Sequence, residues 1–208
     1  MGEVKRTYDS PRRRRQAEAT RRRLAASARK LFAQRGYAAT TIESITSDAG
    51  VAVQTFYATF GSKRTVLFAL LDEVEREADL PGLREQLRQS ANDPPRQLRH
   101  VVDFNVRLFQ GTGDVLEVLR AAGSADADLA SAWREGEDRR CGGQAPLVRE
   151  WVRLDALSPG LQEHEAADIL WAFTGPDTYR LFIRERGWSV SRYADWLTSA
   201  LQQLLFKA

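Results

Sequence analysis

The chain has 208 residues, 43% hydrophobic and 28% charged, which is ordinary for a globular protein of one or two domains. No run approaches the roughly 18 consecutive apolar residues of a membrane-spanning helix. No apolar stretch of a secretion signal follows the basic N-terminus. A single cysteine, Cys141, cannot form a disulfide within the chain. These features predict a cytoplasmic protein with no membrane partner.

Charge is distributed unevenly along the chain. The net charge is only +3, but residues 1–70 hold 14 Lys or Arg and 5 Asp or Glu, whereas residues 71–208 hold 17 and 23. A basic first third predicts that a polyanion meets that part of the protein. Residues 1–15, with the run from Arg12 to Arg15, lack an apolar period and predict a flexible basic arm. Such an arm either contacts DNA or is a solvated tail.

Two short helices are predicted after a first helix over residues 16–36. Thr40 and Glu43 have the spacing of a capping box, with Thr40 as the N-cap of the first short helix. Gly50 stands where a helix needs a residue that tolerates positive φ. A second short helix starts near residue 53. Two helices joined by a tight turn with glycine form a helix-turn-helix, whose second helix can enter a DNA major groove.

The second short helix is predicted to have one buried and one open face. Phe56 and Phe60 are four residues apart and point inward. The opposite face carries small or hydrogen-bonding side chains. These are Gln54, Thr55 and Ala58, flanked by Tyr57.

A dense set of residues between Arg21 and Val74 matches a known domain. The matching residues are Ala28-Arg29-Lys30-Leu31-Phe32, Gly36-Tyr37, Thr40-Thr41, Ile45, Ala49-Gly50-Val51, Thr55-Phe56-Tyr57, Phe60, Ser62-Lys63 and Leu67. This stretch resembles the DNA-binding domain of the TetR family of transcriptional regulators. Two positions depart from the family pattern, because Ala52 replaces a common capping Ser and Val53 replaces a residue that is often polar or basic.

The resemblance implies a double-stranded DNA operator, a homodimer and an unknown small-molecule effector as partners, with no cofactor. Thr41 and Lys63 are expected to bind DNA phosphates at the two edges of the helix-turn-helix. The other expected contacts lie on or beside the groove. The full set of expected DNA-binding residues is Thr40, Thr41, Val53, Gln54, Thr55, Tyr57, Ala58, Thr59 and Lys63.

Four segments are predicted along the chain. Residues 1–15 are the basic arm, residues 16–62 the DNA-binding domain, and residues 63–80 a connecting helix. Pro81 marks the boundary to a C-terminal domain for ligand binding and dimerisation, residues 81–208.

The C-terminal domain is predicted to be helical throughout. Helical periods run over residues 81–91, 97–109, 115–122 and 126–154. Gly111-Thr112-Gly113 predicts a turn between two of these helices. Gly142-Gly143 and Pro146 predict a break or bend in the last one, whereas the family resemblance implies one unbroken helix.

The last fifty residues also resemble one branch of the family, through residues 167–173, 179–181 and 184–188. The final helix has a wide apolar stripe that either pairs with a second chain in a four-helix bundle or packs within its own chain. The resemblance favours the dimer. The expected interface is Ile169, Phe173, Tyr193, Trp196, Leu197, Ala200, Leu201 and Leu204.

Several aromatic side chains provide an apolar interior for the C-terminal domain. They either line an effector cavity or fill a core, and the expectation of a cavity rests on the resemblance. The candidate ligand-binding residues are Phe104, Phe109, Trp133, Trp151, Trp171 and Phe173.

No catalytic constellation is visible in the sequence. His100 and His164 are far apart, and there is no nucleophile elbow, dinucleotide fingerprint or zinc spacing. The sequence therefore predicts an all-α protein that is not an enzyme and binds no metal, and the family resemblance implies a ligand-responsive repressor. Two other classes remain: a helical small-molecule carrier or enzyme, and a non-specific architectural DNA-binding protein.

Overall fold

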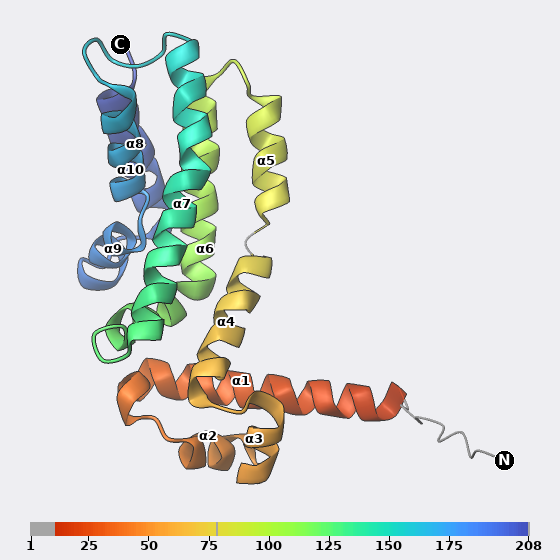
Figure 1. Ribbon diagram of the computed structural model, residues 1–208. Coiled ribbons are helices and arrows are strands. Elements are labelled where there is room, and N and C mark those ends of the chain that lie inside the picture. Colours follow the sequence, from red (N-terminus) through yellow and green to blue (C-terminus); the bar gives the residue numbers. More distant parts are fainter. Residues whose placement is uncertain (1–10, 78, 208) are drawn as a thin grey trace, which may run out of the picture. The chain divides into compact units, whose positions relative to one another are not determined.

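A computed structural model describes residues 11–77 and 79–207, and all the regular elements in this part are helices (Figure 1). The all-α prediction is confirmed. Within the described residues, no helix is both long enough and apolar enough to cross a bilayer. The chain divides into two compact units, Met1–Leu71 and Asp72–Ala208. The division falls inside the segment 63–80 that the sequence predicts as a connecting helix.

The first unit contains α1 (Pro11–Ala39), α2 (Ile42–Ala49), α3 (Val53–Phe60) and the start of α4 (Lys63–Glu77). Its core combines one stripe of α1 with the inner faces of the three shorter helices. The buried members are Leu24, Ala28, Leu31, Phe32, Ile45, Ala49, Phe56, Phe60, Val66, Leu67 and Leu70.

Helix α1 starts earlier than the sequence predicts. Residues 11–15 are helical, so the expectation of a flexible arm is wrong for them, and residues 1–10 lie outside the described part of the chain. Pro11 suits the first position of a helix, and the arginines that follow are good helix formers. The regular helix ends as predicted at Gly36, whose φ of 79° and ψ of 164° are not helical.

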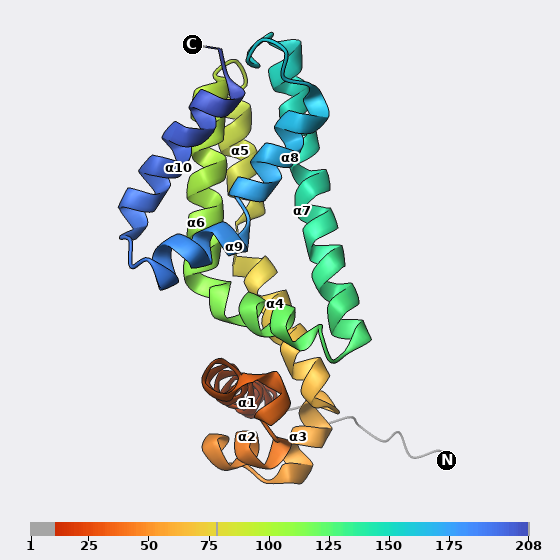
Figure 2. The same ribbon diagram turned by 90° about the vertical axis from the view of Figure 1, so that its left-hand side faces the viewer.

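The second unit is built on two long helices that pack side by side, α6 (Pro94–Ala122) and α7 (Ala127–Arg153). Figure 2 shows them flanked by shorter helices. Helix α5 (Leu80–Gln89) and α10 (Val190–Leu205) pack on α6, and α8 (Glu163–Phe173) packs on α7. Between α8 and α10 the chain forms α9 (Pro176–Tyr179) and a π-helix, η1 (Arg180–Glu185).

The predicted turn at Gly111-Thr112-Gly113 and the predicted break at Gly142-Gly143 and Pro146 are wrong, because both helices continue through these residues. Helix α6 is continuous through Gly111 and Gly113, although it bends in its C-terminal part (Figure 2), and α7 is continuous through Gly142-Gly143 and Pro146. Glycine costs roughly 1 kcal/mol in a helix and proline about 3 kcal/mol, and tertiary packing outweighs such costs. In α6, Thr112 between the glycines is buried, and its hydroxyl donates to the carbonyl of Leu108 at 2.5 Å.

Because α6 is continuous at Gly111, Gly111→Ala should raise the free energy of unfolding by about 0.5–1 kcal/mol. Gly111 is exposed, and an added Cβ meets nothing within 4 Å. Urea denaturation measures the change. Gly50→Ala is the control that should destabilise, since Gly50 has a φ of 63°. A destabilised Gly111→Ala variant would mean that α6 turns there after all.

Candidate nucleic-acid interface

Helix α2 begins one residue later than the capping box predicted from the sequence. Thr41, not Thr40, is the N-cap: its hydroxyl accepts from the amide of Ser44 at 3.1 Å, and the Ser44 hydroxyl accepts from the amide of Thr41 at 3.2 Å. Thr40 is fully buried, and its hydroxyl donates to the carbonyl of Gly36 at 2.8 Å. Thr40 therefore supports the α1–α2 connection, and its side chain is not placed to touch DNA, which corrects the expectation for this residue.

The turn between α2 and α3 depends on the left-handed conformation of Gly50, with φ 63° and ψ 43°. The amide of Val51 then donates to the carbonyl of Thr46 at 3.0 Å, which closes the turn. Ala52 stands at the N-cap of α3 and supplies no side-chain hydrogen bond. Helix α3 therefore depends on tertiary contacts for its order.

Helix α3 presents the open face that the sequence predicts. Phe56 is completely buried and Phe60 is 5% exposed, whereas Tyr57 is 52% exposed. The exposed or half-buried positions around Tyr57 are Val53, Gln54, Thr55, Ala58 and Thr59. The ridge thus consists of uncharged, mostly small or hydrogen-bonding side chains.

Helix α1 fixes both short helices. Lys30 forms a 2.6 Å ion pair with Asp48 near the end of α2, and its ammonium holds the pKa of Asp48 below the usual value. The guanidinium of Arg21 lies 4.4 Å from the ring centroid of Phe60, and Arg21 Nη1 donates to the carbonyl of Thr59 at 3.4 Å. These contacts hold the open face of α3 in one orientation relative to α1.

Lys63, at the start of α4, ties the α1–α2 connection to α4. Its ammonium donates to the carbonyls of Tyr37 at 2.7 Å and Thr40 at 2.8 Å, and lies 4.3 Å from the centroid of the Tyr37 ring. Burial lowers the pKa of Lys63. An ammonium has three N–H donors, and two of these are used inside the protein.

Comparison with known proteins identifies this arrangement. A family model for bacterial regulatory proteins of the tetR family matches residues 24–70. Over 148 residues the chain is 33% identical to the HTH-type transcriptional regulator EthR of Mycobacterium tuberculosis, covering 70% of this chain and 67% of the relative. EthR of Mycobacterium bovis matches equally well, at 33% identity over 148 residues. The chain belongs to the TetR family.

Solved structures show the same fold. The Pseudomonas aeruginosa protein NalD, described as the secondary repressor of the MexAB-OprM multidrug efflux pump, superposes with a TM-score of 0.69 at 20% identity, covering 93% of this chain and 98% of NalD. SmeT, solved with triclosan, gives a TM-score of 0.69 at 21% identity, covering 91% and 92%. As a TetR-family member, this protein is a DNA-binding transcriptional regulator, and α2–α3 is its helix-turn-helix.

The aromatic residues expected to bind a ligand in this TetR-family protein do not gather in one pocket. Phe109 and Trp133 line a cavity of about 20 Å³ together with Tyr179, which is room for about one water molecule. Trp151 belongs to the buried core elsewhere, where its indole donates to Gln97 at 2.8 Å. The other three are Phe104, which is buried, and Trp171 and Phe173, which are partly buried.

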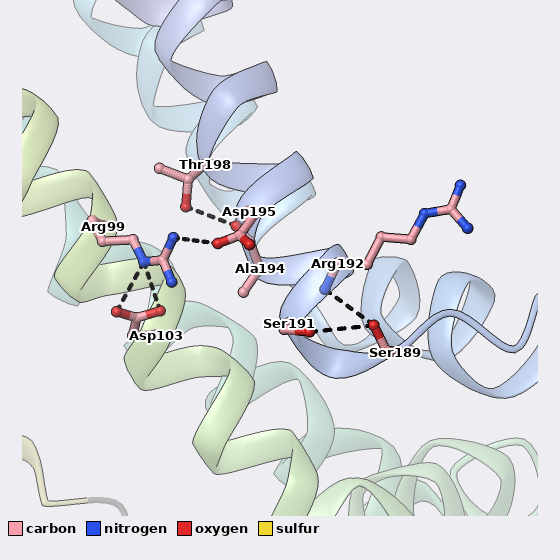
Figure 3. A network of polar contacts seen from close by, with 8 residues as sticks. All are labelled: Arg99, Asp103, Ser189, Ser191, Arg192, Ala194, Asp195 and Thr198. Carbon is pink, nitrogen blue, oxygen red and sulfur yellow. Dashed lines mark hydrogen bonds and ion pairs between the residues drawn. The ribbon is translucent and has the colours of Figure 1, made fainter.

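The predicted dimer interface divides into two groups. Tyr193, Leu197 and Leu201 are at most 1% exposed within a single chain, so no partner can reach them, and their assignment to the interface is wrong. They lie on the inner face of α10, which packs on α6. Figure 3 shows Arg99 of α6 bonded to Asp195 of α10 at 2.7 Å beside this contact. The members that keep exposed surface are Ile169, Phe173, Trp196, Ala200 and Leu204.

Removing the ammonium of Lys63 should destabilise the protein. Lys63→Met leaves the carbonyls of Tyr37 and Thr40 without these donors, and we expect the free energy of unfolding to fall by about 1–2 kcal/mol. Denaturant unfolding of the full chain measures it. Lys30→Met is the matched control, because it removes a more exposed ion pair worth roughly 0–1 kcal/mol. Equal losses in the two variants would contradict a supporting role for Lys63.

Proposed function

We propose that this protein is a ligand-responsive repressor whose α3 enters the major groove of a palindromic operator. The observation that carries the proposal is the open ridge around Tyr57, on a helix whose opposite face is anchored by Phe56. Two short helices of this kind, joined by a tight turn, are a recognised means of reading base edges. The proposed DNA contacts are Thr41, Val53, Gln54, Thr55, Tyr57, Ala58, Thr59 and Lys63.

Lys63 can serve both the fold and the DNA in this proposal. Its two internal hydrogen bonds go to neutral carbonyls, so they do not cancel the charge of the ammonium. One N–H remains for a phosphate. The internal bonds would then position the ammonium in advance, which lowers the entropy lost on binding.

Two copies of the chain would place two α3 ridges on one duplex. The surface proposed for pairing is the outer stripe of α10, formed by Trp196, Ala200 and Leu204 at i, i+4 and i+8, together with the exposed part of α8. Leu204 is 45% exposed in the single chain. A two-fold dimer requires half-sites separated by one helical turn, roughly 34–36 Å, or a multiple. Residues 63–80 would connect the DNA-binding domain, residues 16–62, to the pairing and ligand domain, residues 81–208.

The effector is proposed to enter beside Phe109 and Trp133. A cavity of about 20 Å³ is too small for an organic molecule, so a ligand must displace side chains to bind there. The ligand would therefore favour a different state of the second unit. Release of the operator follows only if that state binds DNA less well, because a ligand acts through its differential affinity for two states.

Selection of genomic fragments by the purified protein tests the function. We expect enrichment of one inverted repeat, and release of that fragment by some members of a small-molecule library. Genes beside the enriched fragment would indicate the class of effector. Recovery of fragments with no shared sequence would reject operator recognition and favour a non-specific DNA-binding protein.

Substitution of the ridge should weaken binding to the selected operator. We expect Tyr57→Ala and Thr55→Ala each to weaken the free energy of operator binding by about 1–3 kcal/mol, which is roughly 5- to 150-fold in affinity. Each variant loses a side chain that contacts bases, and one base contact contributes about this much. Fluorescence anisotropy with the operator measures the loss. Random duplex serves as the control ligand, and its affinity should change little. Unchanged operator affinity in both variants would place the recognition surface elsewhere.

A charge on the outer stripe of α10 should separate the subunits. We expect Leu204→Glu to sediment as a monomer, since a buried, unpaired carboxylate is costly at an apolar interface. Leu80→Glu is the control, because Leu80 on α5 is 43% exposed in the single chain, close to the 45% of Leu204. The control should keep the native association state. A dimer that persists in Leu204→Glu would exclude this stripe as the pairing surface.

A further inference from the structure

The inner stripe of α1 changes character along the helix. Leu24 and Ala28 face the core of the first unit and are completely buried. Following the same helical face toward the N-terminus leads to Arg21, Ala17 and then the pair Arg13-Arg14. Residues 11–19 are all exposed. In this part of α1, the helical face that is buried at Leu24 and Ala28 is exposed to solvent. It carries arginine side chains there instead of leucine.

A hollow separates this part of α1 from α3. It has a volume of about 1050 Å³ and is lined by residues 13–22 of α1 and by Thr55, Ala58 and Thr59 of α3. Figure 1 shows the first turns of α1 running on past α2 and α3. The α1 wall holds five arginines and one acid, Glu18, which is ion-paired with Arg22 at 3.2 Å. One wall is therefore strongly basic, and the other is part of the proposed recognition helix.

The two helices of the helix-turn-helix, α2 and α3, have no cationic side chain that could neutralise a phosphate. Helix α3 contains no charged residue, and the only charged residues of α2 are Glu43 and Asp48. Affinity for DNA comes largely from cations that neutralise phosphates. Cations near α3 must therefore be supplied by neighbouring elements, and the basic wall of the hollow is next to it.

We propose that this hollow, which we name the α1–α3 hollow, receives the sugar-phosphate backbone of the strand that borders the major groove occupied by α3. The inference rests on the proposed function and extends it, because it assigns a second contact surface on the same duplex. The helical segment 11–21 is roughly 15 Å long at about 1.5 Å per residue. Its guanidiniums neutralise phosphates without reading bases, so this surface adds affinity rather than sequence preference.

The test replaces Arg13, Arg14 and Arg15 together by Ala, which keeps the helix because alanine is the best helix former. A matched control replaces three exposed arginines of the second unit, Arg84, Arg107 and Arg134, by Ala and so removes the same charge. Circular dichroism and the unfolding midpoint check that both variants remain folded. Affinity for the selected operator and for random duplex is then measured at several salt concentrations.

We expect the α1 variant to lose affinity for both duplexes alike, by roughly tenfold or more, and to flatten the salt dependence by about two to three ion equivalents. The control should keep most of the native slope. Hydroxyl-radical footprinting should show that protection is lost only at sugars flanking each half-site.

An unchanged salt slope on both duplexes would overturn the proposal. A loss confined to the operator would also overturn it, because it would indicate base reading by α1. If the native protein showed no preference for any duplex, the proposed function would fail. The slope on random duplex would still decide whether the α1–α3 hollow binds phosphates.

Discussion

The burial of Phe56 and Phe60 determines how α3 faces its surroundings. An isolated helix of eight residues is not stable in water, and α3 also lacks a side-chain N-cap. Its order must come from the core beneath it and from Arg21, which covers the Phe60 ring. Because the two phenylalanines are fixed on the inner face, helical geometry leaves Tyr57 exposed. The candidate recognition surface is thus a consequence of core packing on its reverse side.

Under the proposed function, close packing in the second unit would link ligand binding to conformational change. Its core is filled by side chains such as Trp151 and Leu197, which are almost completely buried. The cavity beside Phe109 has room for about one water molecule. An effector that binds at this cavity would therefore have to move its walls. One of those walls includes η1, and π-helical segments are often found at functional sites. Under the proposed function, the energy that moves these walls must come from the ligand's own contacts.

Local patterns in the sequence were sufficient for the helix-turn-helix but not for features that depend on tertiary contacts. The phenylalanine spacing and Gly50 gave the two short helices and the exposed Tyr57. Thr40 and Thr41 are equally good caps by sequence, and only the burial of Thr40 decides between them. Gly111 suggested a turn because its weak helix propensity is visible locally, whereas the packing of α6 is not. The apolar stripe of α10 is so wide that the sequence alone does not show which of its residues pack within the same chain.

Under these proposals, different helices recognise the base sequence and bind the phosphates of DNA. Helix α3 has hydrogen-bonding groups and no charge, whereas α1 has charge but, in its first turns, is separated from α3 by the α1–α3 hollow. Contacts that lie far apart and share no partner contribute independently to binding. Changes in α3 would then alter which sequence is preferred with little effect on the salt dependence, and changes in the first turns of α1 would do the reverse. Such a separation would allow the affinity of the protein for DNA to be adjusted without altering its choice of operator.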